Sequence, residues 1–172
     1  PHNVFTSSEN WSNMLLQYGN NKELFSAAKG WKYTSIVGKS IANSSMLTID
    51  FSLSYGVMWS YNPKTVLYAR STNGAAEVDA SGARIMARNI LVQFTDVQVI
   101  AGDDSDRKKI KTIGSGKAMV LKKGAVIHGT WEKKSAKERT RFYDNKHREI
   151  VLAPGNTWVE VVDTSMKVEV LK

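Results

Sequence analysis

The feature that most constrains the fold is a change, near residue 45, to apolar residues that alternate with polar ones. The alternation is clearest at residues 46–51, 57–61 and 65–70. A period of two places every second side chain on the same face of a strand, so each segment predicts a strand with one buried face. The turn sequence Asn62-Pro63-Lys64 joins the last two segments and predicts a hairpin. Residues 90–100 are a longer β-branched run, typical of a buried central strand.

The last third of the chain predicts a meander of short strands. Turn sequences rich in Lys, Gly, Asp, Asn and Pro lie at residues 122–124, 144–146 and 154–156. The strands expected around them are residues 117–121, 125–131, 140–143, 149–152, 157–162 and 168–171. Short strands at this spacing are typical of a curled sheet, a sandwich or a partial barrel.

The first quarter of the chain has the helical period instead. Thr6 and Glu9 have the spacing of a capping box, in which each side chain bonds the backbone amide of the other residue. The apolar residues that follow fall on one helical face: Trp11, Met14, Leu15 and Tyr18. Asn20 is expected to start a second short helix that ends at Gly30.

These patterns together predict an α+β fold in a single domain, residues 1–172. One or two short N-terminal helices within residues 1–35 lead into a mostly antiparallel β body over residues 45–172. Because the opening residues lack the basic and apolar regions of a signal peptide, any targeting segment is expected upstream of them.

Composition and charge narrow the function classes. The chain is 42% hydrophobic and 23% charged, as globular proteins are. No apolar run approaches the roughly 18 residues that a membrane-spanning helix needs. There is no cysteine, which excludes disulfides, thiolate metal sites and a cysteine nucleophile within these residues. The formal net charge of +8 favours anionic surroundings: nucleic acid, an anionic membrane face or an acidic cell-wall polymer.

Three blocks of sequence carry a resemblance to a known family. They are the opening PHNVFTS, the central RIMARNILVQF, and a closing block that runs from GSGKAMVLKKGAVIHGTWEK to APGNTWVEVV. In this order, and over nearly the whole chain, they resemble the C-terminal half of the YerB-like bacterial lipoproteins, a DUF3048-type family of unknown function.

The resemblance implies a protein held outside the cytoplasmic membrane by a lipid anchor that lies upstream. It also implies a preceding N-terminal domain, on which residues 1–35 are expected to pack. Family members commonly carry a histidine at the position of Glu77, so no imidazole chemistry is expected at that point of this chain.

Six polar residues are candidates for a ligand-binding cleft. His2 and Asn3 precede a capped helix, and Arg88 and Asn89 precede an apolar strand, where packing holds a side chain rigidly. The set is completed by Arg70 and Asp79. The alternative is that these residues only cap and join elements. The sequence assigns no catalytic residue.

Gly114-Ser115-Gly116-Lys117 has only a superficial likeness to a phosphate loop. Such a loop needs Ser or Thr after its lysine and then a helix, whereas Ala118 begins a strand-like run here. A tight turn is therefore predicted. The histidines His2, His128 and His147 lack metal-ligand spacing, so we expect no metal site and no cofactor.

A basic segment, residues 133–141, lies between Trp131 and the pair Phe142-Tyr143. No RNA-recognition aromatic motif accompanies its cations, so an exposed hairpin tip with weak anion binding is predicted. Trp131 and Trp158 lie at strand positions and are predicted to pack in the β body. If they were exposed, they would instead offer a stacking platform for sugars or bases.

Three functions are consistent with these observations. The first is an extracytoplasmic binding or scaffold module whose partner is an anionic envelope polymer or another envelope protein. The second is an enzyme that acts on cell-envelope material through the polar cleft. The third, less favoured, is a nucleic-acid-binding module that uses the basic hairpin and residues 107–111 (RKKIK). Contact with a membrane is expected only through the upstream lipid anchor.

Overall fold

The computed structural model describes residues 7–18, 30–36, 38–40, 46–104 and 107–171, which form one helix and thirteen strands. The helix α1 spans Ser8–Tyr18. The strands are β1 (Met46–Ser52), β2 (Tyr55–Asn62), β3 (Leu67–Thr72), β4 (Ala75–Ala76), β5 (Met86–Ala87), β6 (Asn89–Thr95), β7 (Val97–Val99), β8 (Lys108–Ile110), β9 (Gly114–Lys122), β10 (Ala125–Lys133), β11 (Arg141–Asp144), β12 (Thr157–Asp163) and β13 (Val168–Leu171).

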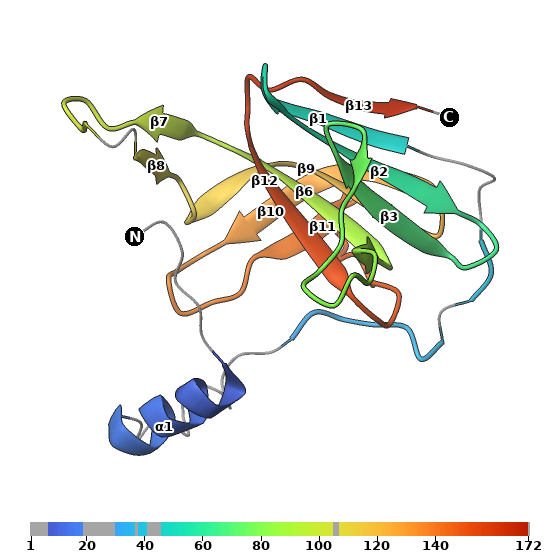
Figure 1. The fold of residues 1–172 in the computed structure, drawn as a ribbon, viewed down its shortest axis with the longest axis horizontal. Coiled ribbons are helices and arrows are strands. Elements are labelled where there is room, and N and C mark those ends of the chain that lie inside the picture. The colour runs from blue at the N-terminus through green and yellow to red at the C-terminus, as the bar shows by residue number, and fades with distance from the viewer. Residues whose placement is uncertain (1–6, 19–29, 37, 41–45, 105–106, 172) are drawn as a thin grey trace.

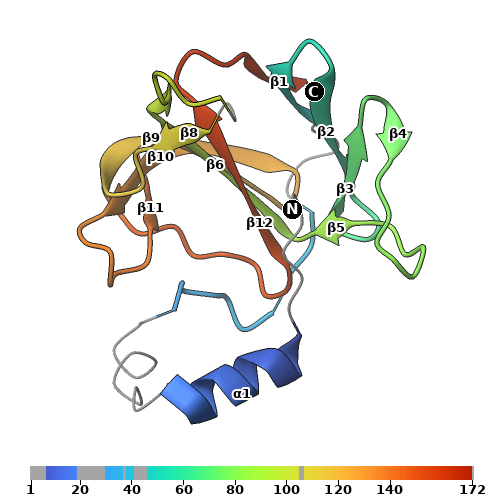
Figure 2. The same ribbon diagram turned by 60° about the vertical axis from the view of Figure 1, so that its left-hand side comes forward.

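Two sheets make up the β body (Figures 1 and 2). Sheet I has the order β13-β1-β2-β3-β4, with β5 also paired to β3, and sheet II has the order β11-β10-β9-β6-β12. The β7–β8 pair forms a separate ribbon that projects from the body (Figure 1). Among the described strands, every pairing is antiparallel except that of β6 with β12. The predicted, mostly antiparallel β body is confirmed, and its sheets do not close into a barrel.

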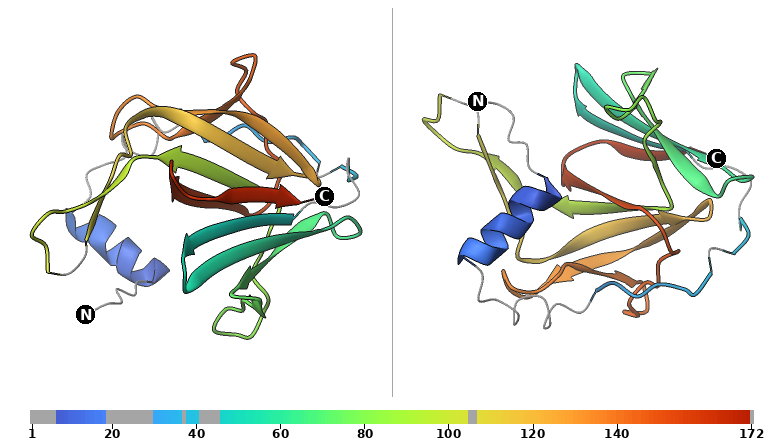
Figure 3. Two further views of the ribbon diagram at one scale, coloured as in Figure 1. Left: turned by 90° about the horizontal axis from the view of Figure 1, so that it is seen from above. Right: turned by 60° about the horizontal axis from the view of Figure 1, so that its bottom comes forward.

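The main core lies between the two sheets, which face each other in Figure 3. Sheet I contributes Leu47, Ile49, Val57, Trp59 and Tyr68, and sheet II contributes Ile90, Val92, Met119, Leu121 and Val162. These positions follow the alternation of the sequence, because every second residue of a strand points to the same face. The expected hairpin of β2 and β3 is confirmed, with the Asn62 side chain accepting a hydrogen bond from the Lys64 amide at 2.9 Å.

Sheet II also buries its opposite face, in a second cluster that includes Leu91, Val120, Trp131 and Phe142. Residues 31–34, which the sequence assigned to the helical lead-in, run extended across the edge of this cluster. The Thr34 amide donates to the Leu152 carbonyl at 2.9 Å. Residues 31–34 of the predicted lead-in therefore pack on the β body, whereas α1 lies apart from it.

Trp131 is fully buried because a glycine opposite it leaves room for the indole. Trp131 pairs with Gly116 across β9 and β10, and its Nε1 donates to the Phe94 carbonyl at 2.6 Å. A Cβ built on Gly116 would lie 2.6 Å from both the Phe94 oxygen and the Trp131 Nε1. Trp158 is half-buried against the main core. The predicted packing of both tryptophans in the β body is confirmed.

The helix α1 lies apart from the two sheets in the views of Figures 1 and 2. Ser7 caps it, because its Oγ accepts from the Asn10 amide at 3.1 Å. Thr6, the predicted cap, lies outside the described residues, as does the predicted second helix up to Gly30. Trp11, Met14 and Leu15, on the predicted apolar face, are exposed.

One local prediction is confirmed in part and two were wrong. Residues 90–95 form the buried interior strand β6, as expected, but the strand ends at Thr95, beyond which Asp96 interrupts the run and β7 is largely exposed. Residues 114–117 begin the long strand β9 instead of forming a tight turn. Gly116 is needed in this strand because a Cβ there would collide with Phe94 and Trp131. Residues 149–152 form only single bridges, Tyr143 with Glu149 and Tyr33 with Leu152.

We predict that Gly116→Ala lowers the free energy of unfolding by about 2–3 kcal/mol, because the added methyl collides with the buried Trp131–Phe94 hydrogen bond. The measurement is chemical denaturation followed by tryptophan fluorescence. Gly30→Ala is the matched control, since a Cβ there meets no atom within 4 Å, and its effect should stay within about 0.5 kcal/mol. Equal effects of the two changes would contradict the packing role of Gly116.

A second prediction concerns Glu149, which accepts from Arg141 Nη1 at 2.6 Å and lies 3.0 Å from Lys32 Nζ. Burial raises the pKa of this carboxyl, but hydrogen bonds and charge from Lys32 and Arg141 outweigh burial and leave the pKa below its usual value. A carboxyl whose pKa is lower in the folded state than in the unfolded state stabilises the fold at pH values above its unfolded-state pKa. This stabilisation is lost as the pH falls through the folded-state pKa.

Glu149→Gln should therefore destabilise the protein by about 1 kcal/mol at pH 7. The difference from wild type should shrink as the pH falls below about 4. Thermal unfolding across this pH range measures the difference, with the exposed Glu138→Gln as control. A difference that is the same at pH 3 and pH 7 would refute the assignment.

Candidate functional site

The structure describes four of the six predicted cleft residues, and His2 and Asn3 lie outside the described residues. Arg70, Arg88 and Asn89 are side chains that hold neighbouring segments in place, whereas Asp79 is exposed and lines a cleft. Arg88 and Asn89 lie at the start of β6, beside the start of β12, and Arg70 lies on β3, which pairs with β5.

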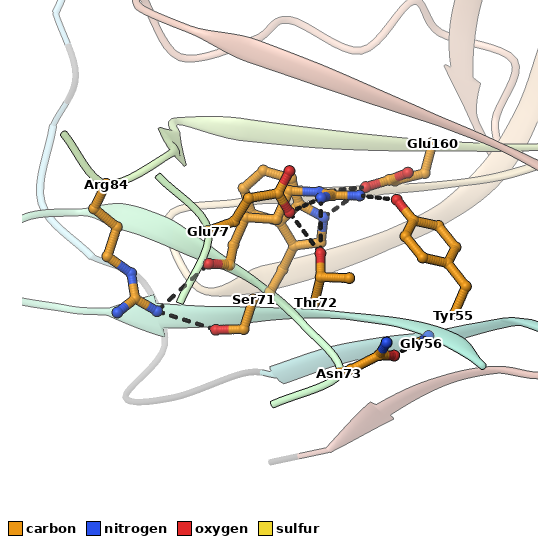
Figure 4. Close-up of polar contacts among 10 residues, drawn as sticks. Tyr55, Gly56, Ser71, Thr72, Asn73, Glu77, Arg84 and Glu160 are labelled. Atoms are coloured by element: carbon orange, nitrogen blue, oxygen red, sulfur yellow. Dashed lines mark hydrogen bonds and ion pairs between the residues drawn. The ribbon is translucent and has the colours of Figure 1, made fainter. Parts of the chain in front are cut away.

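Arg70 is buried between the sheets and is the centre of a polar cluster. Figure 4 labels its partners Tyr55, Glu77 and Glu160. Its Nη1 donates to the Glu77 carboxylate, and its Nη2 donates to the Tyr55 hydroxyl at 3.2 Å. Its Nε lies 3.6 Å from Oε1 of Glu160, a buried residue of β12. The same Glu160 oxygen accepts from Trp59 Nε1 at 2.8 Å. This cluster joins sheet I to sheet II through opposite charges.

Two tryptophan rings pack against the Arg70 guanidinium. Its Cζ lies 5.0 Å from the centroid of Trp158 and 5.9 Å from that of Trp59, within the range of cation–π attraction. The two indoles also contact each other, with centroids 5.4 Å apart. The position of the Trp158 ring is therefore fixed from two sides.

Arg70 also fastens the segment between β4 and β5. Its carbonyl accepts from the Glu77 amide at 3.2 Å, and its amide donates to the Ile85 carbonyl at 3.0 Å. Arg84 Nη2 lies 3.4 Å from the Arg70 carbonyl and donates to Ser71 Oγ at 3.1 Å (Figure 4). The residues of this segment are thus held against β3 at both ends.

A cleft of about 550 Å³ opens beside this cluster, and we call it the Trp158 cleft. Its lining residues are Leu67, Asp79, Arg84, Ile85, Met86, Ala87, Asn156, Thr157 and Trp158. The cleft therefore combines an indole, a carboxylate and a guanidinium with apolar side chains, a combination found in small-molecule sites.

Asp79 is ionised at neutral pH. The Ser81 hydroxyl and amide donate to its Oδ1 at 2.6 and 2.8 Å, and the Ala83 amide does so at 3.1 Å. These hydrogen bonds, that of the Ser81 hydroxyl first, hold the pKa of the carboxyl below its usual value against a smaller opposing effect of burial.

Arg88 and Asn89 support the wall of the cleft. The Asn89 side chain is buried, donates to the Ala153 carbonyl at 2.9 Å and to Thr157 Oγ1 at 3.0 Å, and accepts from the Ala153 amide. The Arg88 side chain donates to the Val66 carbonyl at 3.0 Å, and its amide donates to the Asn156 carbonyl at 2.8 Å. Both side chains hydrogen-bond to protein atoms, as expected if these residues only cap and join elements.

A second hollow, the lysine groove, lies over the outer half of sheet II and encloses about 740 Å³. Lys117 on β9 pairs with Thr130 on β10, which in turn pairs with Tyr143 on β11, so the three side chains share a face. His147 stacks on Tyr143 with ring centroids 4.6 Å apart and lines the groove. The charged lining residues of the groove are Lys117, Lys133, Lys134 and Glu132.

A third hollow, of about 370 Å³, shares the lining residue Lys133 with the lysine groove. Lys137 and Arg139 line this third hollow, and the Arg139 guanidinium lies 5.0 Å from the Trp31 ring centroid. Five cations and the two carboxylates Glu132 and Glu138 therefore surround the two adjoining hollows. The basic segment is an exposed loop, as predicted, but it also forms the wall of concave surfaces.

Within the described residues, no group of three or more His, Cys, Asp or Glu side chains is arranged to hold a metal ion. In the same part of the chain, no helix has the length and apolar character needed to cross a membrane.

Sequence reasoning missed Glu160 and Arg84. The sequence pattern around Glu160 could have identified it. Glu160 lies between Trp158 and Val162 at the inward-facing positions of β12, where an acid needs a buried partner. Arg84 had no such signal, since its contacts depend on the bridge between Val78 and Arg84, which no sequence pattern marks.

Comparisons with known proteins agree with this fold. Residues 47–159 match the family model described as "Protein of unknown function (DUF3048) C-terminal domain". The crystal structure of the YerB protein from Bacillus subtilis is similar to the whole of this chain, with a TM-score of 0.74 and 21% sequence identity. The chain corresponds to 56% of the length of that protein's chain. A search of curated proteins found no match.

We predict that Arg70→Met lowers the free energy of unfolding by about 3–5 kcal/mol, because it leaves the buried Glu160 without its cation. Urea denaturation measures the change, and the exposed Lys64→Met, with an effect within about 0.5 kcal/mol, is the control. If Arg70→Met were as mild as the control, the guanidinium would not hold the sheets together.

Proposed function

The chain belongs to the DUF3048 C-terminal domain family, and on that premise we propose that it is a non-enzymatic binding module that holds an anionic polymer of the cell envelope. The observation that carries the proposal is the lysine groove, together with the third hollow that shares Lys133 with it. An extracytoplasmic location is part of the proposal, and its support is the resemblance to the YerB-like lipoproteins.

The shape and charge of the groove suit a polymer. The two hollows share Lys133 in their linings and both expose cations, so successive anionic groups of a polymer that passes this residue can each find a partner. The lysines are flexible point charges, and the Glu132 carboxylate lies 3.9 Å from Lys134 Nζ. Such a surface recognises spacing and charge more than the shape of one small molecule.

An envelope-acting enzyme has less support from the geometry. Arg70, Arg88 and Asn89 bond to neighbouring protein groups and so act as structural supports. Asp79, which lines the Trp158 cleft, has a lowered pKa, whereas a general acid or base needs a pKa near the working pH.

A nucleic acid presents the same phosphate charges, so the experiment must separate the two polymers. The exposed cations at Arg107, Lys108 and Lys109 lie on the separate β7–β8 ribbon and not in the groove. A nucleic-acid module would use both basic regions, whereas the proposed polymer site uses the groove alone.

We predict that poly(glycerol phosphate) binds in the groove, and that the triple change Lys117→Gln, Lys133→Gln and Lys134→Gln weakens its binding. Each lysine–phosphate contact that is lost should reduce the slope of log affinity against log salt by about 0.7, so the slope should fall by about 2. Fluorescence anisotropy with labelled polymer at several salt concentrations measures this slope.

The matched control removes the same charge elsewhere, by changing the exposed Lys39, Lys64 and Lys167 to Gln. This control should retain the wild-type slope. Equal losses in both triple variants would show non-specific attraction and overturn the groove as the site. Single-stranded DNA that binds more tightly than poly(glycerol phosphate) at physiological salt would identify the chain as a nucleic-acid module instead.

A further inference from the structure

We propose that the Trp158 cleft is a second, separate binding site, and that its ligand is a sugar ring that carries a carboxylate. The cleft shares no lining residue with the lysine groove or the hollow beside it. The inference does not depend on the proposed function, because it rests on a different surface with a different balance of charge.

The indole of Trp158 supplies a preformed platform. The ring is half-buried, so one part of it packs in the core while another part lines the cleft. Contacts with Arg70 and Trp59 hold its orientation before any ligand arrives. A fixed aromatic face is the surface on which the C–H face of a sugar packs, and no entropy is spent in ordering it.

Arg84 supplies the cation for the carboxylate. Arg84 lines the cleft, and the hydrogen bond from its Nη2 to Ser71 Oγ at 3.1 Å restrains the planar guanidinium. A guanidinium pairs with a carboxylate through two parallel hydrogen bonds, which gives direction as well as attraction. Lysines on a flexible loop, like those of the lysine groove, lack this directionality.

Asp79 supplies the acceptor for sugar hydroxyls. Three donors from Ser81 and Ala83 fix its Oδ1, so the carboxylate has a set orientation and remains anionic at neutral pH. The presence of Asp79 opposes binding of a multiply charged polymer at this point. One cation and one anion beside an aromatic ring favour a ligand with a single negative charge and several hydroxyls.

The volume agrees with this class of ligand. About 550 Å³ lies within the range of small-molecule sites and leaves space for one or two sugar rings. Apolar side chains of Leu67, Ile85 and Met86 line the rest of the cleft, where the less polar face of a ring can pack.

The test compares methyl glucuronide with methyl glucoside, two probes that differ only in the carboxylate. Backbone amide shifts in two-dimensional NMR report where each sugar binds. We expect shifts at Met86, Thr157 and Trp158, and glucuronide binding about tenfold tighter than that of glucoside. Arg84→Gln should reduce this ratio to about twofold or less, and Asp79→Asn should weaken both sugars by about fivefold.

Two controls keep the outcome interpretable. Lys117→Gln, in the lysine groove, should leave both sugar affinities unchanged. Arg84→Lys keeps the charge without the planar fork, so it should retain only part of the ratio even if Arg84→Gln folds poorly. Equal affinities of the two sugars for the wild-type protein, or no shift in the cleft up to about 50 mM of either sugar, would overturn the proposal. Neither outcome would affect polymer binding in the groove.

Discussion

The buried guanidinium of Arg70 is the interaction on which the arrangement of the two sheets depends. A charge removed from water persists only when an opposite charge and hydrogen bonds compensate it. Here the compensation comes from several different elements: Glu160 on sheet II, Glu77 after β4, and the indoles of Trp59 and Trp158. Because the partners belong to different elements, the sheets cannot slide past each other at this end without exposing the charge. The Trp158 wall of the adjacent cleft is held rigidly for the same reason, since Trp158 contacts Arg70.

The fold was predictable where one local pattern determined the structure. The alternation at residues 46–51 and 57–61 predicted strands and their buried faces, because the period of two belongs to the strand itself. The parallel pairing of β6 with β12 was not predictable, since the same alternation serves either direction. Gly116 misled for a related reason: glycine indicates a turn when considered alone, yet its missing Cβ here accommodates an indole from the next strand.

The site was predictable only in part, because its residues act through each other. Arg70 and Asp79 were identified from the sequence as polar residues of one cleft, but only Asp79 lines a cleft, whereas Arg70 is a buried support. Asn89 was also identified, but its side chain is hydrogen-bonded to the backbone of Ala153. Arg84 gave no signal, because its position is set by a bridge between segments that no local pattern describes.

The parallel pairing of β6 with β12 has a consequence for how the chain reaches this structure. Asn89 and Thr157, joined by a side-chain hydrogen bond, are 68 residues apart in the sequence, and β9, β10 and β11 lie between them. A contact of such separation forms only after the entropy of closing the intervening loop has been lost, so it is formed late. The hairpins of sheet II can form earlier from neighbouring segments, and β12 then adds to a preformed edge. Refolding should therefore be slow for a chain of this length, and Glu160 can reach Arg70 only once β12 has added to that edge.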